Sequence, residues 1–221
     1  MEAATPAIAR PYHHGNLRAA LVLAGYDLAA QWGTDAVTLR AVTRAAGVTP
    51  SAAYRHFDSV DDLRLAVGAR AGRGLAQCIE RHQAAVDEAD PVRRAQVLLE
   101  AVGVGYMAFA LDQPGAFEVA MFGLVTMEHA DDPEGAGDTG RTAFQLLTDA
   151  LAGLVATGQL SADRVDAAAI QCWSSVHGFA SLATRGPLRD RPRPVLDALA
   201  RQLCADVVGA VLASGRVRGG G

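Results

Sequence analysis

The sequence predicts an all-α protein of about nine helices, and three features support this prediction. Apolar residues recur with helical spacing along most of the chain, and helix-capping residues precede these segments. Sustained alternation of apolar and polar residues is absent, as are Asn-Gly hairpin turns. Aromatic residues make up only 5% of the 221 residues. We expect three short helices at the N-terminus followed by a larger helical bundle.

The first segments carry clear helix boundaries. A helix over 16–32 ends before Gly33, and Thr38 precedes a short helix over 39–46 that Gly47 stops. Thr49 is the expected cap of the next helix, with Pro50 at its first position, where a missing N–H costs nothing.

The body is predicted to contain six further helical segments. Ser59 and Asp62 form a predicted capping box that opens a long helix toward Glu88. The remaining segments are expected at 91–112, 116–125, 141–157, 162–184 and 194–214, with a break at 113–115 and a polar loop at 129–140. We therefore divide the chain into an arm (1–15), a head (16–60), a body (61–215) and a tail (216–221).

Composition limits the class of protein. Apolar residues make up 50% of the chain, too many for a disordered protein. The overall net charge is −4, yet residues 10–57 carry five arginines and two aspartates, a net charge of +3, which leaves −7 for the remainder. A basic head on an acidic body predicts a localised anion-binding surface.

Targeting and redox features are consistent with a cytoplasmic protein. The sequence has no uninterrupted run of 18 apolar residues, so we predict no transmembrane helix, and its first residues do not read as a signal peptide. Cys78, Cys172 and Cys204 are widely spaced, so we expect buried thiols in a reducing compartment rather than disulfides or a metal site.

The stretch GVTPSAAYRHF at 47–57 predicts the second helix of a helix-turn-helix. Small residues at its start would allow close approach to base edges, where Ser51 can hydrogen-bond and Ala52 can touch a thymine methyl. Tyr54, Arg55 and His56 follow at the height of the phosphates, while Phe57 is expected to anchor the helix from beneath.

Residues 15–67, above all the pattern TLRxVxxxAGVTxxxxYRHFxSxxxL, resemble the DNA-binding domain of the tetracycline-repressor (TetR) family of bacterial transcriptional regulators. The resemblance implies a nine-helix, homeodomain-like fold that binds double-stranded DNA. It assigns the DNA contacts to Thr38, Arg40, Thr49, Pro50, Ser51, Ala52, Tyr54, Arg55 and His56. Val60 stands where many members have a basic residue, so that phosphate contact would be lost or limited to backbone N–H groups.

PYHHGNLR at the front and CWSSVHGFASL near the end resemble the subgroup named for a Trp-His-Gly pattern, here Trp173, His177 and Gly178. We expect Gly178 to permit a close helix crossing. A structural role for Trp173 and His177 and a role in ligand binding both remain open. His13 and His14 lack further ligands, so a phosphate-contacting arm is favoured over a metal site.

The last two helices carry broad apolar stripes, which favour a homodimer through a four-helix interface. The stripes are formed by Val165, Ala169, Trp173, Val176 and Ala180, and by Leu196, Leu199, Leu203, Val207 and Val211. Two heads about one DNA turn apart, or a multiple of one turn, would fit a pseudo-palindromic operator.

Bulky, adaptable side chains in the body predict either core packing or a cavity for a mostly apolar effector. The candidate ligand-binding residues are Tyr106, Phe109, Met121, Phe122, Phe144, Trp173 and His177, with Met107, Phe117 and Met127 nearby in sequence. By family analogy, an effector would shift the long helix and release a repressor from DNA.

The alternatives are a constitutive or architectural DNA binder of the same fold and a small-molecule carrier without DNA affinity. Ser174 and Ser175 beside His177 have no defined acidic partner, and the sequence has no glycine-rich phosphate loop after a strand. We therefore expect no enzymatic activity, no cofactor and no metal site.

Overall fold

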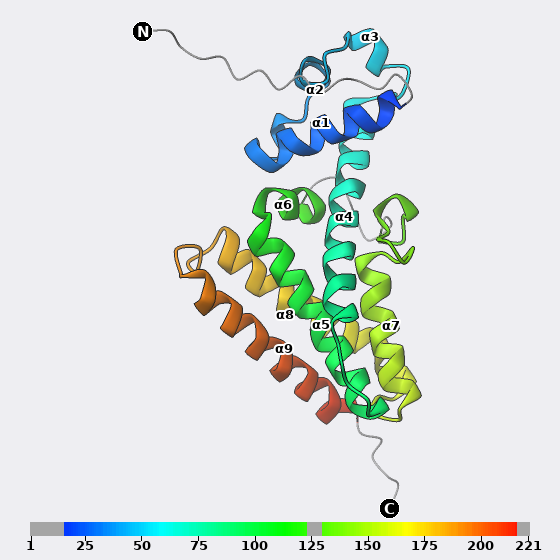
Figure 1. Ribbon diagram of the computed structural model, residues 1–221, viewed down its shortest axis with the longest axis vertical. Coiled ribbons are helices and arrows are strands. Elements are labelled where there is room, and N and C mark those ends of the chain that lie inside the picture. Colours follow the sequence, from blue (N-terminus) through cyan, green and yellow to red (C-terminus); the bar gives the residue numbers. More distant parts are fainter. Residues whose placement is uncertain (1–15, 123–129, 216–221) are drawn as a thin grey trace, which may run out of the picture.

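The computed structural model describes residues 16–122 and 130–215 (Figure 1). These residues form nine α-helices and three short 3-10 helices, with no strand among them, which confirms the predicted all-α class. The predictions for the arm, for the tail and for Met127 concern residues outside these ranges.

The head contains α1 to α3 at one end of the elongated molecule (Figure 1). Its elements are α1 (Leu17–Trp32), the 3-10 helix η1 (Thr34–Ala36), α2 (Leu39–Ala45) and α3 (Pro50–Ala53). The side chains of Asn16 and Thr38 cap α1 and α2 by accepting from the N–H groups of Ala19 and Ala41. Gly33 and Gly47, at φ 83° and 70°, end these helices in a conformation that glycine adopts without strain.

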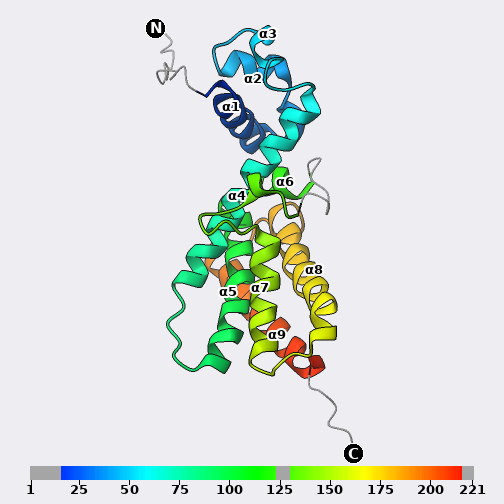
Figure 2. The same cartoon turned by 90° about the vertical axis from the view of Figure 1, so that its right-hand side faces the viewer.

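The body consists mostly of longer helices, with α5 in contact with the second half of α4 and with α6 to α9 (Figures 1 and 2). Its elements are α4 (Val60–Ala84), α5 (Pro91–Asp112), α6 (Pro114–Phe122), η3 (Pro133–Gly135), α7 (Ala143–Ala156), η4 (Ala162–Arg164), α8 (Val165–Thr184) and α9 (Arg193–Gly215). Helix α4 ends at Ala84, short of the predicted end near Glu88. The predicted break at 113–115 is limited to Gln113, which separates α5 from α6, because Pro114 occupies the first position of α6, where its missing N–H costs nothing.

The capping box predicted at α4 is only half formed. Ser59 Oγ accepts from the N–H of Asp62, as expected. The Asp62 carboxylate, however, accepts from the N–H of Asp58 (3.2 Å) and not from that of Ser59. A full capping box forms instead at α7, between Thr142 and Gln145.

Helix α4 belongs to two hydrophobic cores. Its first half contributes Leu63 and Val67 to the core of the head, in which Phe57 is almost fully buried. Its second half contributes Leu75 and Ile79 to the core of the body. The head and the body are therefore joined by a continuous helix that is buried in both, as expected for a rigid connection.

Close contacts also hold the head against α6. A Cβ on Gly115 would lie 2.0 Å from the carbonyl oxygen of Ala30, so the end of α1 and the start of α6 pack backbone to backbone. Beside this contact, Tyr26 donates from its hydroxyl to Gln113 Oε1 (2.9 Å), and the Arg70 guanidinium lies 5.1 Å above the Tyr26 ring.

The predicted close crossing at Gly178 does not form within the chain, because a Cβ there would meet no atom within 4 Å. Close crossings occur at two glycines of α5 instead. A Cβ on Gly103 would lie 2.6 Å from Cys204 Sγ, and one on Gly105 would lie 2.7 Å from Ile79 Cα.

Helix α5 is long and apolar enough to cross a membrane, but 56% of its most apolar window is buried inside the protein. It contacts α4, α6, α7, α8 and α9. These contacts are typical of the central helix of a bundle, whose apolar faces are covered by its neighbours.

The backbone contact at Gly115 predicts that Gly115→Ala destabilises the protein by about 1–3 kcal/mol, because neither backbone can yield without moving the head. Urea denaturation followed by circular dichroism measures the change. Gly153→Ala is the control: Gly153 lies within α7, and an added Cβ would have only an ordinary contact at 3.9 Å with Ala95. A Gly115→Ala variant as stable as this control would contradict the packing described.

Candidate DNA-binding surface and ligand cavity

Helices α2 and α3 form a helix-turn-helix held from beneath by apolar residues. Val42 and Ala53 are fully buried and Phe57 is 2% exposed, so all three anchor the pair to the head core. In the turn, the N–H of Val48 donates to the carbonyl of Thr43 (2.9 Å). The expectation that Phe57 is an anchor is confirmed by its burial.

The opposite side of this pair is exposed to solvent at the tip of the head (Figure 1). Tyr54 is 58% exposed, so it is not part of the hydrophobic core. Phe57, three residues later, is a core aromatic residue. The side chains that reach the surface here are Thr38, Arg40, Thr49, Pro50, Ser51, Tyr54, Arg55 and His56, with Ala52 half-buried among them.

Two local details differ from the predicted recognition helix. Helix α3 has only four residues and ends at Ala53, so Tyr54, Arg55 and His56 lie in the turn that follows. Thr49 occupies the N-cap position, but its side chain forms no capping hydrogen bond. The small residues therefore stay at the start of the helix, and the polar residues project from a turn beside it.

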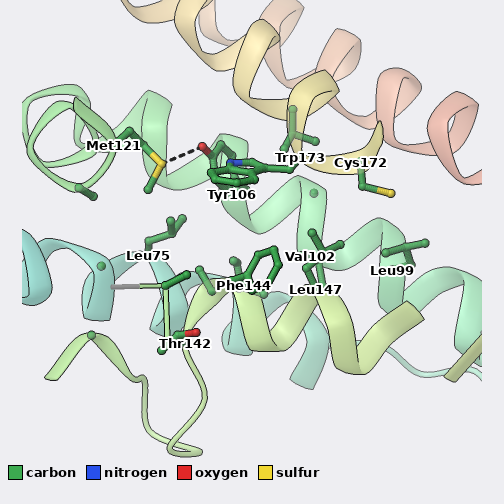
Figure 3. Close-up of a pocket in the computed structure, with 18 of the residues that line it drawn as sticks. Leu75, Leu99, Val102, Tyr106, Met121, Thr142, Phe144, Leu147, Cys172 and Trp173 are labelled. Atoms are coloured by element: carbon green, nitrogen blue, oxygen red, sulfur yellow. Dashed lines mark hydrogen bonds between the residues drawn. The ribbon is translucent and has the colours of Figure 1, made fainter. Parts of the chain in front are cut away.

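A cavity of about 380 Å³ lies in the body and is lined by residues of α4 to α9 and of the segment 130–142 (Figure 3). Its wall is predominantly apolar. The lining residues are Leu65, Gly68, Ala69, Gly72, Leu75, Ile79, Leu99, Val102, Gly103, Tyr106, Ala120, Met121, Ala130, Asp132, Gly135, Thr142, Ala143, Phe144, Leu147, Cys172, Trp173, Val176, Cys204, Val207 and Val208.

The cavity includes four of the predicted ligand-binding residues, namely Tyr106, Met121, Phe144 and Trp173. Phe109 does not line it, because its ring packs against α4 at Gly74, where a Cβ would lie 3.1 Å from that ring. His177 does not line the cavity either, but its Nδ1 contacts the hydroxyl of Tyr106, which does. Phe122 ends α6, and its side chain falls outside the described part of the structure.

A polar cluster centred on Tyr106 interrupts the apolar wall. The Tyr106 hydroxyl lies 2.8 Å from His177 Nδ1 and 3.1 Å from Met121 Sδ. Burial raises the pKa of Tyr106, and this effect outweighs a hydrogen bond from Trp173 that lowers it. Burial, and then the nearby Arg185, lower the pKa of His177. Both side chains are therefore favoured in their neutral forms.

Two cysteine thiols line the cavity. Burial raises the pKa of Cys172 to about 11 and that of Cys204 to about 12. Both groups stay protonated at neutral pH, so they act as small apolar groups in the wall rather than as nucleophiles.

A loop that we call the strap, residues 130–142, closes one side of the cavity and follows α4 toward the head. The Glu80 carboxylate of α4 accepts from the N–H groups of Asp138 (2.8 Å) and Thr139 (2.9 Å) and from the Thr139 hydroxyl (2.6 Å). Earlier in the strap, Glu134 forms an ion pair of 3.2 Å with Arg18 of α1.

The contribution of the strap to the cavity was not predicted, because its polar composition indicated only a loop. A second contribution that we missed is the face of small residues on α4. Gly68 and Gly72 stand four residues apart and so lie on one side of the helix, where they leave space for the cavity. The spacing of these two glycines in the sequence could have predicted this part of the cavity.

The serines beside His177 do not form a nucleophilic site. The hydroxyls of Ser174 and Ser175 both donate to the carbonyl of Gln171 within α8, at 3.2 and 2.7 Å. Such bonds within a helix are the usual arrangement for serine in a helix interior.

Sequence comparisons match both parts of the chain to one family. Residues 21–67 match the profile described as bacterial regulatory proteins of the tetR family. Residues 99–207 match the profile of the tetracyclin repressor-like C-terminal domain. An uncharacterized HTH-type transcriptional regulator of Mycobacterium tuberculosis is 27% identical over 158 residues, which cover 72% of this chain and 66% of that protein.

Solved structures share the fold over most of the chain. A protein of unknown function from Rhodococcus sp. RHA1 has a TM-score of 0.68 at 22% identity and covers 92% of this chain and 100% of its own. A TetR protein of Acinetobacter baumannii in complex with minocycline gives a TM-score of 0.60 at 16% identity, with 89% and 97% covered. The fatty acid degradation regulator FadR of Bacillus halodurans gives 0.61 at 14%, with 86% and 97% covered.

These matches span the helix-turn-helix head and most of the body in the order found here. The family consists of transcriptional regulators rather than enzymes. The chain belongs to the TetR family of bacterial transcriptional regulators.

Proposed function

We propose that this regulator is a homodimeric repressor that binds a pseudo-palindromic operator and is released by a mostly apolar small molecule. The observation that carries the proposal is the position of the strap and α4, which line the cavity and also contact the head. One continuous set of contacts thus links a ligand site to a DNA-binding surface.

The exposed surface of the helix-turn-helix has the chemistry required for DNA. The arginines at 40 and 55 and the hydroxyl of Tyr54 can donate to phosphates. Ser51 and Ala52 stand at the start of α3, where small side chains allow close approach to base edges. Val60 offers no side-chain donor at the start of α4, so a phosphate there would meet backbone N–H groups alone.

Dimerisation is supported by an exposed apolar surface on α8 and α9, which lie side by side (Figure 1). Most of the stripe predicted from the sequence is buried within the chain, and of its members only Leu199 is largely exposed. Among the described residues, four of the eight large exposed apolar side chains lie on these helices: Ile170, Leu182, Val195 and Leu199. A second copy would remove this surface from water and bring two heads to one duplex.

An effector is supported by the size and character of the cavity, since its volume falls within the range of small-molecule sites, roughly 300–1,000 Å³. This observation favours a ligand-responsive regulator over a constitutive DNA binder with a filled body. Trp173 and Phe144 both line the cavity, with ring centroids 6.1 Å apart and ring planes tilted by 59°, so a ligand there can contact both rings. Trp173, His177 and Gly178 also support membership of the Trp-His-Gly subgroup.

Release from DNA requires that the effector bind the two states of the protein with different affinity. A ligand that displaces the strap would act on α1 through Arg18 and Glu134, and on α4 through Glu80. For a 100-fold loss of DNA affinity, the binding free energies of the effector to the two states must differ by about 2.8 kcal/mol. In this proposal the protein works in the cytoplasm, where its operator is.

Replacing Tyr54 by Phe is expected to weaken binding to all DNA sequences by a similar factor, roughly fivefold, because it removes a phosphate donor. Ser51→Ala is the matched comparison, and it is expected to change the preference among sequences instead. Fluorescence anisotropy with a panel of duplexes measures both effects. Unchanged affinity of Tyr54→Phe would show that this hydroxyl does not contact DNA.

The exposed surface on α8 and α9 predicts that the double variant Ile170→Glu, Leu199→Glu is monomeric, because two buried carboxylates without partners oppose association. Sedimentation velocity measures the mass. Val92→Glu, at a residue that is 41% exposed on α5, is the control and should leave the dimer intact. A double variant that sediments as the parent chain does would place the interface elsewhere.

Glu80→Gln is expected to loosen the strap, because the replacement loses charge-assisted hydrogen bonds from three donors. The amides of Asp138 and Thr139 should then exchange with solvent about tenfold faster or more, as measured by hydrogen exchange. Glu88→Gln, outside α4 and the strap, is the control. Equal exchange in the two variants would refute the anchoring role of Glu80.

A further inference from the structure

The hydroxyl of Thr142 is buried with its hydrogen bonding incomplete. Thr142 is 6% exposed, and its Oγ1 accepts from the N–H of Gln145 (3.3 Å). Its backbone N–H donates to Gln145 Oε1 (3.1 Å). The hydroxyl proton, however, has no acceptor within hydrogen-bond distance in the part of the chain that the structure describes. A hydroxyl carries one donor besides its acceptor sites, so the Thr142 proton is free to pair with an acceptor that enters the cavity.

The other buried hydroxyls show the usual arrangement. Thr43, the second threonine buried to this degree among the described residues, donates to the carbonyl of Leu39 (2.8 Å). The Tyr106 hydroxyl, on another part of the cavity wall, is within reach of His177 Nδ1 and Met121 Sδ. Thr142 therefore differs from both in having a donor to spare, and it lines the cavity.

Thr142 also stands where an oxygen atom would be favoured. It is the N-cap of α7, a helix of 14 residues, and it borders the cavity together with Ala143 and Phe144 (Figure 3). The first turn of a helix presents N–H groups and a partial positive charge. An acceptor beside the Thr142 hydroxyl would receive its proton and lie in this favourable field.

The charges of the wall indicate that the acceptor is uncharged. Among the described lining residues, Asp132 alone is charged, and its carboxylate already accepts from the N–H of Glu134 (2.9 Å). The same set of residues includes no arginine or histidine. A carboxylate ligand would lose its hydration without gaining a cation, whereas a carbonyl group would lose much less.

We propose that the cavity binds an uncharged, mostly apolar molecule with a carbonyl-type oxygen, and that the Thr142 hydroxyl donates to this oxygen. The inference rests on the ligand-binding part of the proposed function and names the chemical class of the effector. Thr142 is also the last residue of the strap. A ligand held by Thr142 therefore acts directly on the loop that Arg18 and Glu80 connect to the head and to α4.

Binding is measured through the fluorescence of Trp173, which lies in the cavity wall. The chain contains two tryptophans, and the other, Trp32, is 68% exposed at the end of α1, so Trp32→Phe leaves a single reporter. In this background, three probes of similar size are titrated: hexanophenone, hexylbenzene and 4-hexylbenzoate. They present a carbonyl group, no polar group and a carboxylate, respectively.

Thr142→Val and Thr142→Ser are compared with these probes. Serine keeps the hydroxyl, whereas valine removes it and also removes the cap of α7, so valine lowers the stability of the body. The readout is therefore the ratio of the Kd of hexanophenone to that of hexylbenzene, because a general loss of stability weakens both alike. We expect this ratio to be roughly fivefold higher in Thr142→Val than in Thr142→Ser, as for one lost hydrogen bond.

We also expect 4-hexylbenzoate to bind at least about tenfold more weakly than hexanophenone. An equal ratio in the two Thr142 variants would overturn the role of Thr142 while leaving a ligand-binding body. Tighter binding of the benzoate than of the ketone would overturn the uncharged class. Absence of saturable binding by all three probes would overturn this inference together with the effector part of the proposed function. DNA binding by the head is tested separately through Tyr54.

Discussion

The structure depends on the burial of α4 in two cores at once. Leu63 and Val67 are fixed in the head by Phe57 and its neighbours, and Leu75 and Ile79 are fixed in the body by α5 and α7. A helix of 25 residues cannot bend sharply without breaking its own hydrogen bonds, so movement of one half is transmitted to the other. The contact between Gly115 and Ala30 adds a second connection, and the ion pair of Arg18 with Glu134 adds a third.

These three connections differ in strength, and the difference suits a regulator. The burial of α4 is extensive, whereas the side chains of Arg18 and Glu134 are 44% and 52% exposed, so their ion pair contributes little to stability. A weak link between the strap and the head can be made or lost without unfolding either part. The stronger hydrogen bonds of Glu80 hold the strap beside the cavity, where a ligand can act on it.

Local signals predicted much of this fold. Thr38 and Ser59 cap helices as predicted, because each side chain accepts from an N–H three residues later, an interaction contained within the sequence window. The exposure of Tyr54 and the burial of Phe57 were predicted from the family pattern. Both residues are aromatic, so only their positions in that pattern distinguish them.

Contacts between distant segments were not predictable in this way. Glu80 meets the strap across 58 residues, so nothing near either segment indicated their pairing. Phe109 was expected in the cavity because it is bulky, but its position on α5 directs it to Gly74 instead. Thr142 was overlooked because a threonine before an apolar helix is explained by capping alone, whereas its burial beside the cavity follows only from the tertiary fold.

The central claim, that the exposed side of the helix-turn-helix binds the DNA backbone, is tested most directly by the salt dependence of DNA binding. The chain is titrated against a duplex from the region upstream of its own coding sequence, at 50 and 200 mM salt. We expect affinity to fall at least about tenfold between these conditions, because two or more phosphates are neutralised on binding. Binding that does not change with salt, or no binding at either concentration, would contradict it.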